Sequence, residues 1–459
     1  MILSGNRLKL ILLAGFGTLV SAQPPAAPAN QAKPIAPIKF SDTRLDNGLR
    51  VILVEDHYAP VYAIAVSYAV GSKDERPGRT GFAHLFEHMM FKGSENVGAG
   101  EHFFLIFNYG GNMNGTTNTD RTVYYEELPK NQLDMGLFLE SDRMRSLAIT
   151  KENLENQRQA VKEERRLGLD NQPYGYSNDR LNELTYDNFA YHHSVIGSMQ
   201  DLDAASVEDV QAFFRTYYAP NNAALAIVGD IDSKETLAKI QKYFGNIPRQ
   251  EPPARVDLTE SPMTGERHEA MEDKLARLSQ VSMTYRIPSA ASADGPALSA
   301  LGSILGGGET SRLYQKLVKE KEVCSGINAF SSERLGPGAL RITCTVRQDK
   351  SLQEAEGLIS EEISRIVAAP VTDQELARVK ASARRSAVAV RTSALSRAIT
   401  LANDASVYND PNRLNTEPDK LMAVSAADVQ RVARTYLRSE NRVLLETTPA
   451  AQPAKTPVP

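Results

Sequence analysis

A segment of seventeen residues occurs twice in this chain, and this repeat constrains the fold more than any other feature of the sequence. Ser206–Asn222 and Ser425–Asn441 align without gaps at an offset of 219, and eight of the seventeen positions are identical. Each copy begins with a serine followed three residues later by an aspartate, a pattern typical of a helix N-terminus. A short apolar strand follows each helix, at Ala224–Val228 and Val443–Leu445. The repeat predicts two related halves produced by duplication.

Each half is expected to be an α+β unit with one core, in which an antiparallel or mixed sheet packs with helices. Apolar and alternating segments predict strands, whereas segments with a helical apolar period predict helices. The predicted strands are Arg50–Val54, Tyr62–Tyr68 and Val281–Tyr285, and the predicted helices are Gly81–Phe91, Glu101–Tyr109, Asn153–Leu169, Ala297–Leu305 and Ser311–Lys321.

The N-terminus has the pattern of a secretory signal peptide. Arg7 and Lys9 precede an apolar run over Leu10–Val20, and the small residues that follow suit cleavage before Gln23. The alternative is an uncleaved membrane anchor, but this run is too short to span a bilayer as a helix. We therefore expect a periplasmic or secreted protein with no integral membrane segment after cleavage.

Composition divides the chain further, because prolines cluster between the two halves and near both ends. The expected segments are the signal peptide 1–22, a Pro/Ala-rich leader 23–38, an N-terminal half 39–247, a linker 248–266, a C-terminal half 267–449 and a Pro/Ala-rich tail 450–459.

The charge balance argues against a nucleic-acid partner. Lys and Arg number 52 and Asp and Glu number 56, so the chain provides no overall field that would collect nucleic acid or anionic lipid. A chain of 459 residues can also bury a core without help from a metal or a disulfide. Any metal is therefore expected to serve chemistry rather than folding.

The chain has only two cysteines, Cys324 and Cys344. They flank a predicted hairpin with its turn in Arg334–Gly338, and only a register centred on Arg334 would place them opposite each other. An oxidising compartment permits a bond between them. Two separate buried thiols are nevertheless the expectation.

The seven histidines provide few candidates for a metal site. We expect His57, His102 and His268 to be solvated and the adjacent His192 and His193 to be structural. The remaining two lie in His84-Leu85-Phe86-Glu87-His88. On a helix both imidazoles share one face and can reach a single ion, with Glu87 beside them. The apolar residues around them would make three polar side chains costly unless a cation such as zinc paired with them.

Tetrahedral zinc needs a third protein ligand. The acidic helix that follows is the best source, because the N-terminal half has no cysteine and its other histidines have been assigned elsewhere. The residues alone leave Glu155, Glu163 and Glu164 open.

The motif His84-x-x-Glu87-His88, with a glutamate 76 positions beyond His88, resembles the inverted zinc motif of the pitrilysin/insulinase metallopeptidases, family M16. The resemblance covers nearly the whole mature chain and implies a clamshell of two homologous halves, of which only the first holds zinc. It implies Glu164 as the third ligand, one Zn²⁺ per chain, and Glu87 as the general base for zinc-bound water.

The segment Gly110–Thr117 is similar to the family's Gly-Gly-x-x-Asn-Ala-x-Thr segment, whose edge strand receives the peptide substrate. Gly115 replaces the usual alanine. The resemblance implies substrate contacts at Gly111, Asn114 and Thr117.

The chain departs from the family pattern in two places. A supporting carboxylate that many members carry is Gln157 here, which implies that this residue supports the site through hydrogen bonds and without charge. An Arg and a Tyr that bind substrate in single-chain members are matched by Val318 and Ser325. The chain thus resembles the zinc-bearing subunit of M16B enzymes of the mitochondrial-processing-peptidase type, which implies an inactive homologous partner that supplies the Arg and Tyr.

The leading hypothesis is a periplasmic or secreted zinc endopeptidase that hydrolyses short or unfolded peptides. A non-catalytic scaffold or peptide-holding subunit of the same fold is the alternative, because fold alone does not settle function. A zinc hydrolase acting on other substrates is less favoured, because the segment around Asn114 suits recognition of a peptide backbone.

Overall fold

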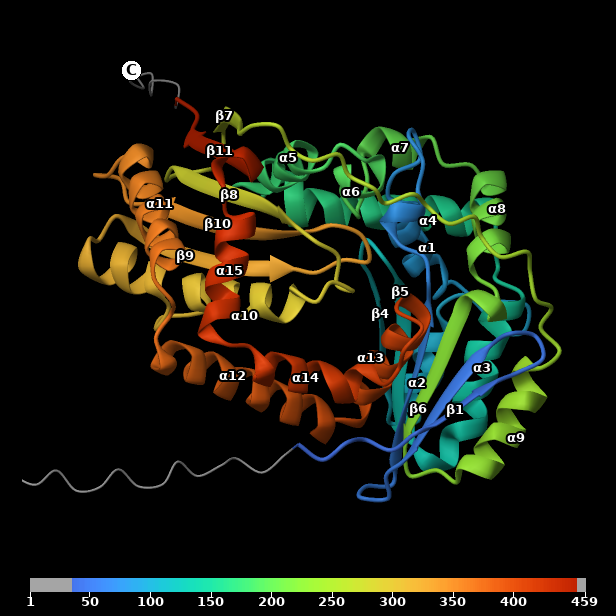
Figure 1. The fold of residues 1–459 in the computed structure, drawn as a ribbon. Coiled ribbons are helices and arrows are strands. Elements are labelled where there is room, and N and C mark those ends of the chain that lie inside the picture. Colours follow the sequence, from blue (N-terminus) through green and yellow to red (C-terminus); the bar gives the residue numbers. More distant parts are fainter. Residues whose placement is uncertain (1–34, 452–459) are drawn as a thin grey trace, which may run out of the picture. The chain divides into compact units, whose positions relative to one another are not determined.

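Two β-sheets organise the chain in the computed structural model, which describes residues 35–451 (Figure 1). Both sheets belong to one compact unit that begins at Pro37. The predicted signal peptide, and most of the predicted leader and tail, lie outside the described residues. Among the helices of the described part, none is long and apolar enough to cross a membrane.

Each half contributes one mixed sheet. The first sheet has the order β1-β2-β6-β3-β5-β4 and the second has the order β7-β11-β8-β10-β9. The strands are β1 Ser41–Arg44, β2 Arg50–Glu55, β3 Val61–Tyr68, β4 Asn112–Thr117, β5 Thr122–Pro129, β6 Ala223–Gly229, β7 Arg267–Asp273, β8 Gln280–Ile287, β9 Cys324–Ser332, β10 Gly338–Val346 and β11 Arg442–Pro449.

The two sheets share one topology, apart from the additional β1. The parallel pair β2–β6 corresponds to β7–β11, and the antiparallel neighbours of β3 correspond to those of β8. The edge strand β4 corresponds to the edge strand β9. The predicted α+β fold of two related halves is confirmed.

The helices lie between these strands in the order that the sequence predicts. They are α1 Phe82–Met89, α2 Glu101–Asn108, α3 Leu133–Arg145, α4 Lys151–Arg165, α5 Gly175–Thr185, α6 Phe189–His192, α7 Met199–Asp203, α8 Val207–Tyr217, α9 Ser233–Phe244, α10 Gly295–Gly306, α11 Leu352–Ala368, α12 Asp373–Thr392, α13 Ala394–Val407, α14 Arg413–Ala423 and α15 Ala426–Tyr436. The predicted helix over Ser311–Lys321 is a π-helix over Tyr314–Glu320, and α4 continues into another over Arg166–Asp170.

The repeated segment forms the same local structure twice. In α8 the side chains of Ser206 and Asp209 form a reciprocal capping box, and Ser425 and Asp428 form the same box in α15. Each box satisfies backbone N–H groups that a helix N-terminus otherwise leaves without partners. An asparagine after each helix, Asn222 or Asn441, donates its side-chain amide to the carbonyl of the repeated tyrosine at 2.8 Å. The duplication is therefore visible in hydrogen bonds as well as in sequence.

One helix from each half packs on the sheet of the other half (Figure 1). α13 covers β3 and β6, where Leu401 and Ala402 are fully buried against a face that includes Ala63 and Ala226. Small side chains on both surfaces let the helix lie close to the sheet. In return, α5 packs on β8 and β11. At the offset of 219, α5 corresponds to α13, so the exchange follows the duplication.

The other face of the first sheet carries larger side chains, including Tyr62, Ile64 and Val66. They form the main core of the first half with residues of α1, α3, α8 and α9. The motif helix α1 is therefore anchored on the face of the sheet opposite α13.

The prediction of two separate thiols is wrong, because Cys324 and Cys344 form a disulfide with their Cα atoms 6.1 Å apart. The hairpin register places Cys344 opposite Ile327. An irregularity next to Val346 then brings Cys324 opposite Val346. The two cysteines are thus diagonal neighbours across the strand pair, an arrangement that a search for directly opposed residues does not consider.

Reduction of this disulfide is expected to lower the free energy of unfolding by about 3 kcal/mol. The bond closes a loop between two residues that are 20 positions apart, and this loop restricts the unfolded chain. Chemical denaturation with and without reductant measures the difference. A Cys324→Ala/Cys344→Ala protein is the control, since reductant should leave its midpoint unchanged. Equal midpoints for the oxidised and reduced wild-type protein would contradict the prediction.

Candidate metal centre

α1 presents its polar residues on one side and its apolar residues on the other. Leu85, Phe86 and Met89 are fully buried in the core, where Phe86 stacks on Tyr218 with ring centroids 4.7 Å apart. The opposite side of the helix packs against α4 and the edge strand β4. The periodicity that buries the apolar side therefore aims the motif's polar residues at those two elements.

His84, His88 and Glu164 converge at this place. One ligand atom from each residue lies within 4.8 Å of the others. Nε2 of His84 is 3.6 Å from a Glu164 oxygen, and Nε2 of His88 is 3.2 Å from the other. Two imidazoles and one carboxylate are a common donor set for zinc. The structure thus brings together the three predicted ligands, with α1 supplying two and α4 the third.

The electrostatics of this cluster suit a bound cation. Burial, together with the neighbouring His88, lowers the pKa of His84 to about 4, so its imidazole is neutral at neutral pH. The hydrogen bond with His88 lowers the pKa of Glu164, so its carboxylate is ionised. The Glu164 side chain is half exposed, which leaves the cluster open to solvent on that side. Neutral imidazole and ionised carboxylate are the forms that bind metal.

Glu163 and Glu155, the other two candidates on α4, form local ion pairs. Glu163 lies 2.9 Å from Arg166, and Glu155 pairs with Arg158. Both carboxylates are exposed. Of the three glutamates that the sequence left open, only Glu164 belongs to the histidine cluster.

Glu87 lies beside the ligands and contacts the edge strand. Thr117 Oγ1, at the end of β4, donates a hydrogen bond of 2.6 Å to the Glu87 carboxylate. Burial raises the pKa of Glu87, although this hydrogen bond acts in the opposite direction. A side chain on Gly115 would crowd Glu87, because a Cβ atom there would lie 2.9 Å from Glu87 Cγ. The glycine that replaces the family's alanine therefore makes room for this carboxylate.

The other predicted site residues lie along β4 and α4. Asn114 is exposed, and its side-chain oxygen accepts a hydrogen bond from the backbone N–H of Gly115. The N–H of Gly111 donates to Ile106 in the turn that precedes β4. Gln157 is buried on α4, and its amide donates to Asn156. Of this group, only Thr117 has a hydrogen bond to the motif in the described structure.

Arg121 was missed by the sequence analysis. Its guanidinium donates to the carbonyl of Thr116 at 2.6 Å, and its charge acts on Glu87. The sequence shows only that Arg121 lies four residues after Thr117. This spacing does not reveal that the chain turns between them and returns the Arg121 side chain to Thr116.

A second group of possible ligands, His102, Glu126 and Glu140, is fully buried nearby. The prediction that His102 is solvated is wrong, because its Nε2 lies 2.7 Å from Glu126. Burial lowers the pKa of His102 to about 3 and raises that of Glu140 to about 8. Arg143 already pairs with Glu140, and its guanidinium carbon lies 4.7 Å from the centre of the Tyr124 ring. The guanidinium of Arg143 thus already fills the centre of this group, and we assign the group as a buried polar network.

In the second half, α10 packs against the edge strand β9, as α1 packs against β4 in the first half. A Cβ atom at Gly306 would lie 2.1 Å from the backbone nitrogen of Ala329 on β9. α10 therefore lies so close to β9 at Gly306 that no side chain fits between them.

Removal of a ligand should abolish zinc binding. We expect Glu164→Ala to lose the zinc that the wild-type protein retains after dialysis, because two imidazoles alone form an incomplete site. Glu163→Ala is the matched control, and it should keep zinc because Glu163 pairs with Arg166. Elemental analysis measures the zinc content of the purified proteins. Zinc retained by Glu164→Ala, or lost by Glu163→Ala, would contradict the ligand set.

Comparison with known proteins identifies the family of this chain. Residues 50–198 match the family described as Insulinase (Peptidase family M16), and residues 204–383 match the one described as Peptidase M16 inactive domain. The chain is 28% identical over 403 residues to the zinc protease PqqE of Helicobacter pylori, which covers 87% of this chain and 90% of that protein.

Solved structures extend the likeness. A protease from Helicobacter pylori aligns with a TM-score of 0.86 and 27% identity, over 90% of this chain and 100% of that one. The periplasmic protease PqqL from Escherichia coli shares the fold, with a TM-score of 0.73 and 21% identity over 90% of this chain and 48% of that chain. This chain thus spans about half of PqqL. The family matches, the zinc-protease relative and the shared fold support a peptidase-type function, and the chain belongs to peptidase family M16.

Proposed function

We propose that this protein is a periplasmic or secreted zinc endopeptidase that hydrolyses short or unfolded peptides. The observation that carries the proposal is the hydrogen bond from Thr117 to Glu87, which joins the carboxylate beside the predicted ligands to the edge strand β4. One bond thereby connects the group that would move protons with the strand that would hold substrate. The proposed secretion rests on the signal-peptide pattern before Gln23.

Three residues, His84, His88 and Glu164, would hold one zinc ion per chain. When bound there, zinc supplies a Lewis acid for the scissile carbonyl and favours ionisation of the attacking water. Glu87 accepts the proton of that water and later transfers it to the leaving amine. Its raised pKa suits the first step, because it makes the carboxylate a stronger base toward the water proton.

The edge strand β4 provides a surface for an extended peptide. It pairs with β5 on one side and is the last strand of the sheet on the other. An added peptide strand can bind to such an edge through backbone hydrogen bonds, which are independent of sequence. Asn112, Asn114 and Thr116 are exposed along it. A peptide on this edge would pass beside Glu87, and only an extended or unfolded segment could adopt that conformation.

The second half contributes no catalytic groups in this proposal. Val318 packs against the core of the second half, and the hydroxyl of Ser325 donates to the carbonyl of Thr345. Neither side chain can replace the Arg and Tyr that single-chain relatives are expected to use. We therefore propose that a homologous M16 chain without the zinc motif supplies them. The match to half of PqqL supports this view, because a longer chain of this fold has room for two such units.

Glu87→Gln should retain zinc and lose peptide hydrolysis. The amide keeps the size of the side chain but cannot accept a proton, so kcat is expected to fall by about 10²- to 10⁴-fold. Hydrolysis of quenched peptides, with zinc analysis of the same samples, measures both effects. Glu163→Gln serves as the control and should behave as wild type. Wild-type turnover by Glu87→Gln would refute the role of Glu87, and a wild-type chain that binds zinc but cleaves no peptide even with the proposed partner added would favour a scaffold.

The partner is tested by reconstitution. Addition of a homologous chain that lacks the zinc motif and carries the Arg and Tyr should raise kcat by about 10²-fold, the effect of one group that stabilises a transition state. The partner alone should be inactive, and a partner with the Arg replaced by Ala should give no increase. Full activity of the pure chain, unchanged by the partner, would contradict this proposal.

A further inference from the structure

The metal helix α1 begins without a cap of its own. Its N-cap residue is Gly81, which has no side chain to accept the first N–H groups of the helix. Gly81 adopts φ +84°, and a Cβ atom there would lie 2.5 Å from the carbonyl oxygen of Ile196. The close approach of the chain at Ile196 therefore requires glycine and prevents any local capping side chain.

Glu75 caps this helix from outside. One carboxylate oxygen accepts the N–H of Gly81 at 2.9 Å, and the other accepts the N–H of Ala83 at 2.8 Å. The side chain of Glu75 is fully buried. A carboxylate at a helix N-terminus is stabilised by both hydrogen bonds and the helix dipole. Ala83 directly precedes the ligand His84, so this contact fixes the backbone at the point where the first ligand leaves the helix.

A buried carboxylate needs a counter-charge, and His193 provides it. Nε2 of His193 lies 2.9 Å from the Glu75 carboxylate, and Nδ1 lies 2.8 Å from the carbonyl oxygen of Phe189. Both ring nitrogens face oxygen acceptors, which requires a proton on each when Glu75 is ionised. Burial opposes this charge, but the hydrogen bond to Glu75 prevails and the pKa of His193 is raised. The Phe189 ring stacks on the imidazole at 4.4 Å and holds its plane.

We propose that the Glu75–His193 ion pair is the positioning device of the metal helix, which sets His84, Glu87 and His88 relative to Glu164. Neither residue touches the proposed ligands, so both act through the backbone of α1. The inference rests on the proposed zinc site. Of the measurements that test it, only the kinetic one requires peptidase activity.

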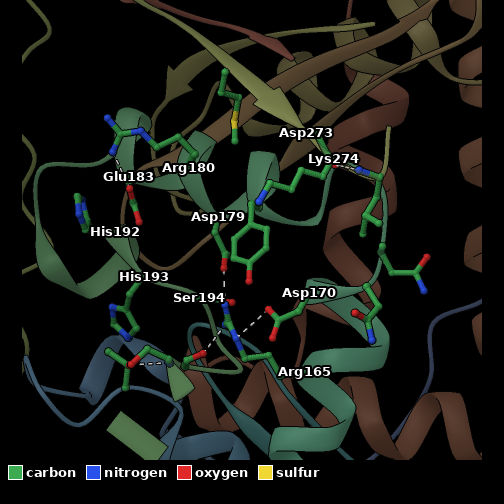
Figure 2. Close-up of a pocket in the computed structure, with 18 of the residues that line it drawn as sticks. Arg165, Asp170, Asp179, Arg180, Glu183, His192, His193, Ser194, Asp273 and Lys274 are labelled. Carbon is green, nitrogen blue, oxygen red and sulfur yellow. Dashed lines mark hydrogen bonds and ion pairs between the residues drawn. The ribbon is translucent and has the colours of Figure 1, made fainter. Parts of the chain in front are cut away.

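The structure also provides a route by which the pair can be tested. His193 lines a cavity of about 800 Å³, and Figure 2 shows it next to His192 in the wall. Arg165, which follows the ligand Glu164, lines the same cavity and lies between Asp170 and Asp179 (Figure 2). A space of this size admits free imidazole, which can replace a deleted histidine side chain.

His193→Ala is expected to lower zinc affinity about tenfold or more, as loss of a group that orients metal ligands commonly does. It should also lower kcat with KM within about twofold of wild type, because substrate binding on β4 is left intact. Added imidazole should restore zinc affinity and kcat toward the wild-type values. Wild-type protein in the same imidazole concentrations corrects for direct coordination of imidazole to zinc.

His192→Ala is the matched control. His192 lines the same cavity and binds the carbonyl of Tyr186 through Nδ1, without contact to Glu75. It should keep wild-type zinc affinity and show no response to imidazole beyond that of the wild-type protein. If His193→Ala does not fold, His193→Gln removes the same charge with a side chain closer in size to histidine. The same loss of zinc affinity and kcat is expected.

Zinc affinity is measured by competition with a chromophoric chelator, and the absorption spectrum of the cobalt-loaded protein reports ligand geometry. Wild-type affinity and spectrum in the His193 variant, or a loss that imidazole leaves unchanged in a folded protein, would overturn the inference. If the wild-type chain binds zinc and cleaves no peptide, the proposed function is wrong but the present inference is not. The zinc affinity and the cobalt spectrum still test whether the Glu75–His193 pair positions the ligands.

Discussion

The packing of α13 on the alanine-lined face of the first sheet is the contact on which the rest of the structure depends. It covers the face that the first half leaves open, while α5 does the same for the second sheet. Neither half can bury both faces of its sheet with its own helices. The opposite face of the first sheet is thereby free to carry α1 and the cluster of His84, His88 and Glu164. The two halves are consequently one folding unit.

Features that arise within one or two turns of chain could be predicted from the sequence. The capping boxes at Ser206 and Ser425 follow from spacing alone, and so does the common face of His84 and His88. The strands β2, β3 and β8 follow from their apolar runs. The duplication added long-range information, because two similar segments must occupy similar places. Agreement among these local signals explains why the fold class was predictable.

The remaining features depend on contacts between distant segments, which local patterns do not encode. His102 directly follows Gly100 and Glu101 in sequence, yet the fold pairs it with Glu126 in the core. The residues alone could not choose Glu164, because its neighbour Glu163 differs only in the direction in which α4 presents it. Glu75 gave no signal of its role, since the N-cap residue of the helix, Gly81, lies six residues later. In each case the deciding partner is set by how elements pack, not by spacing.

The backbone contact between α10 and β9 has a consequence for how this protein could change. Since position 306 has no space for a Cβ atom, no polar side chain can be introduced there while α10 keeps its present distance from β9. The helix would first have to move away from the strand, and with it the core that α10 fills. The distance between these two elements, rather than the identity of any one side chain, therefore limits how this part of the second half can change.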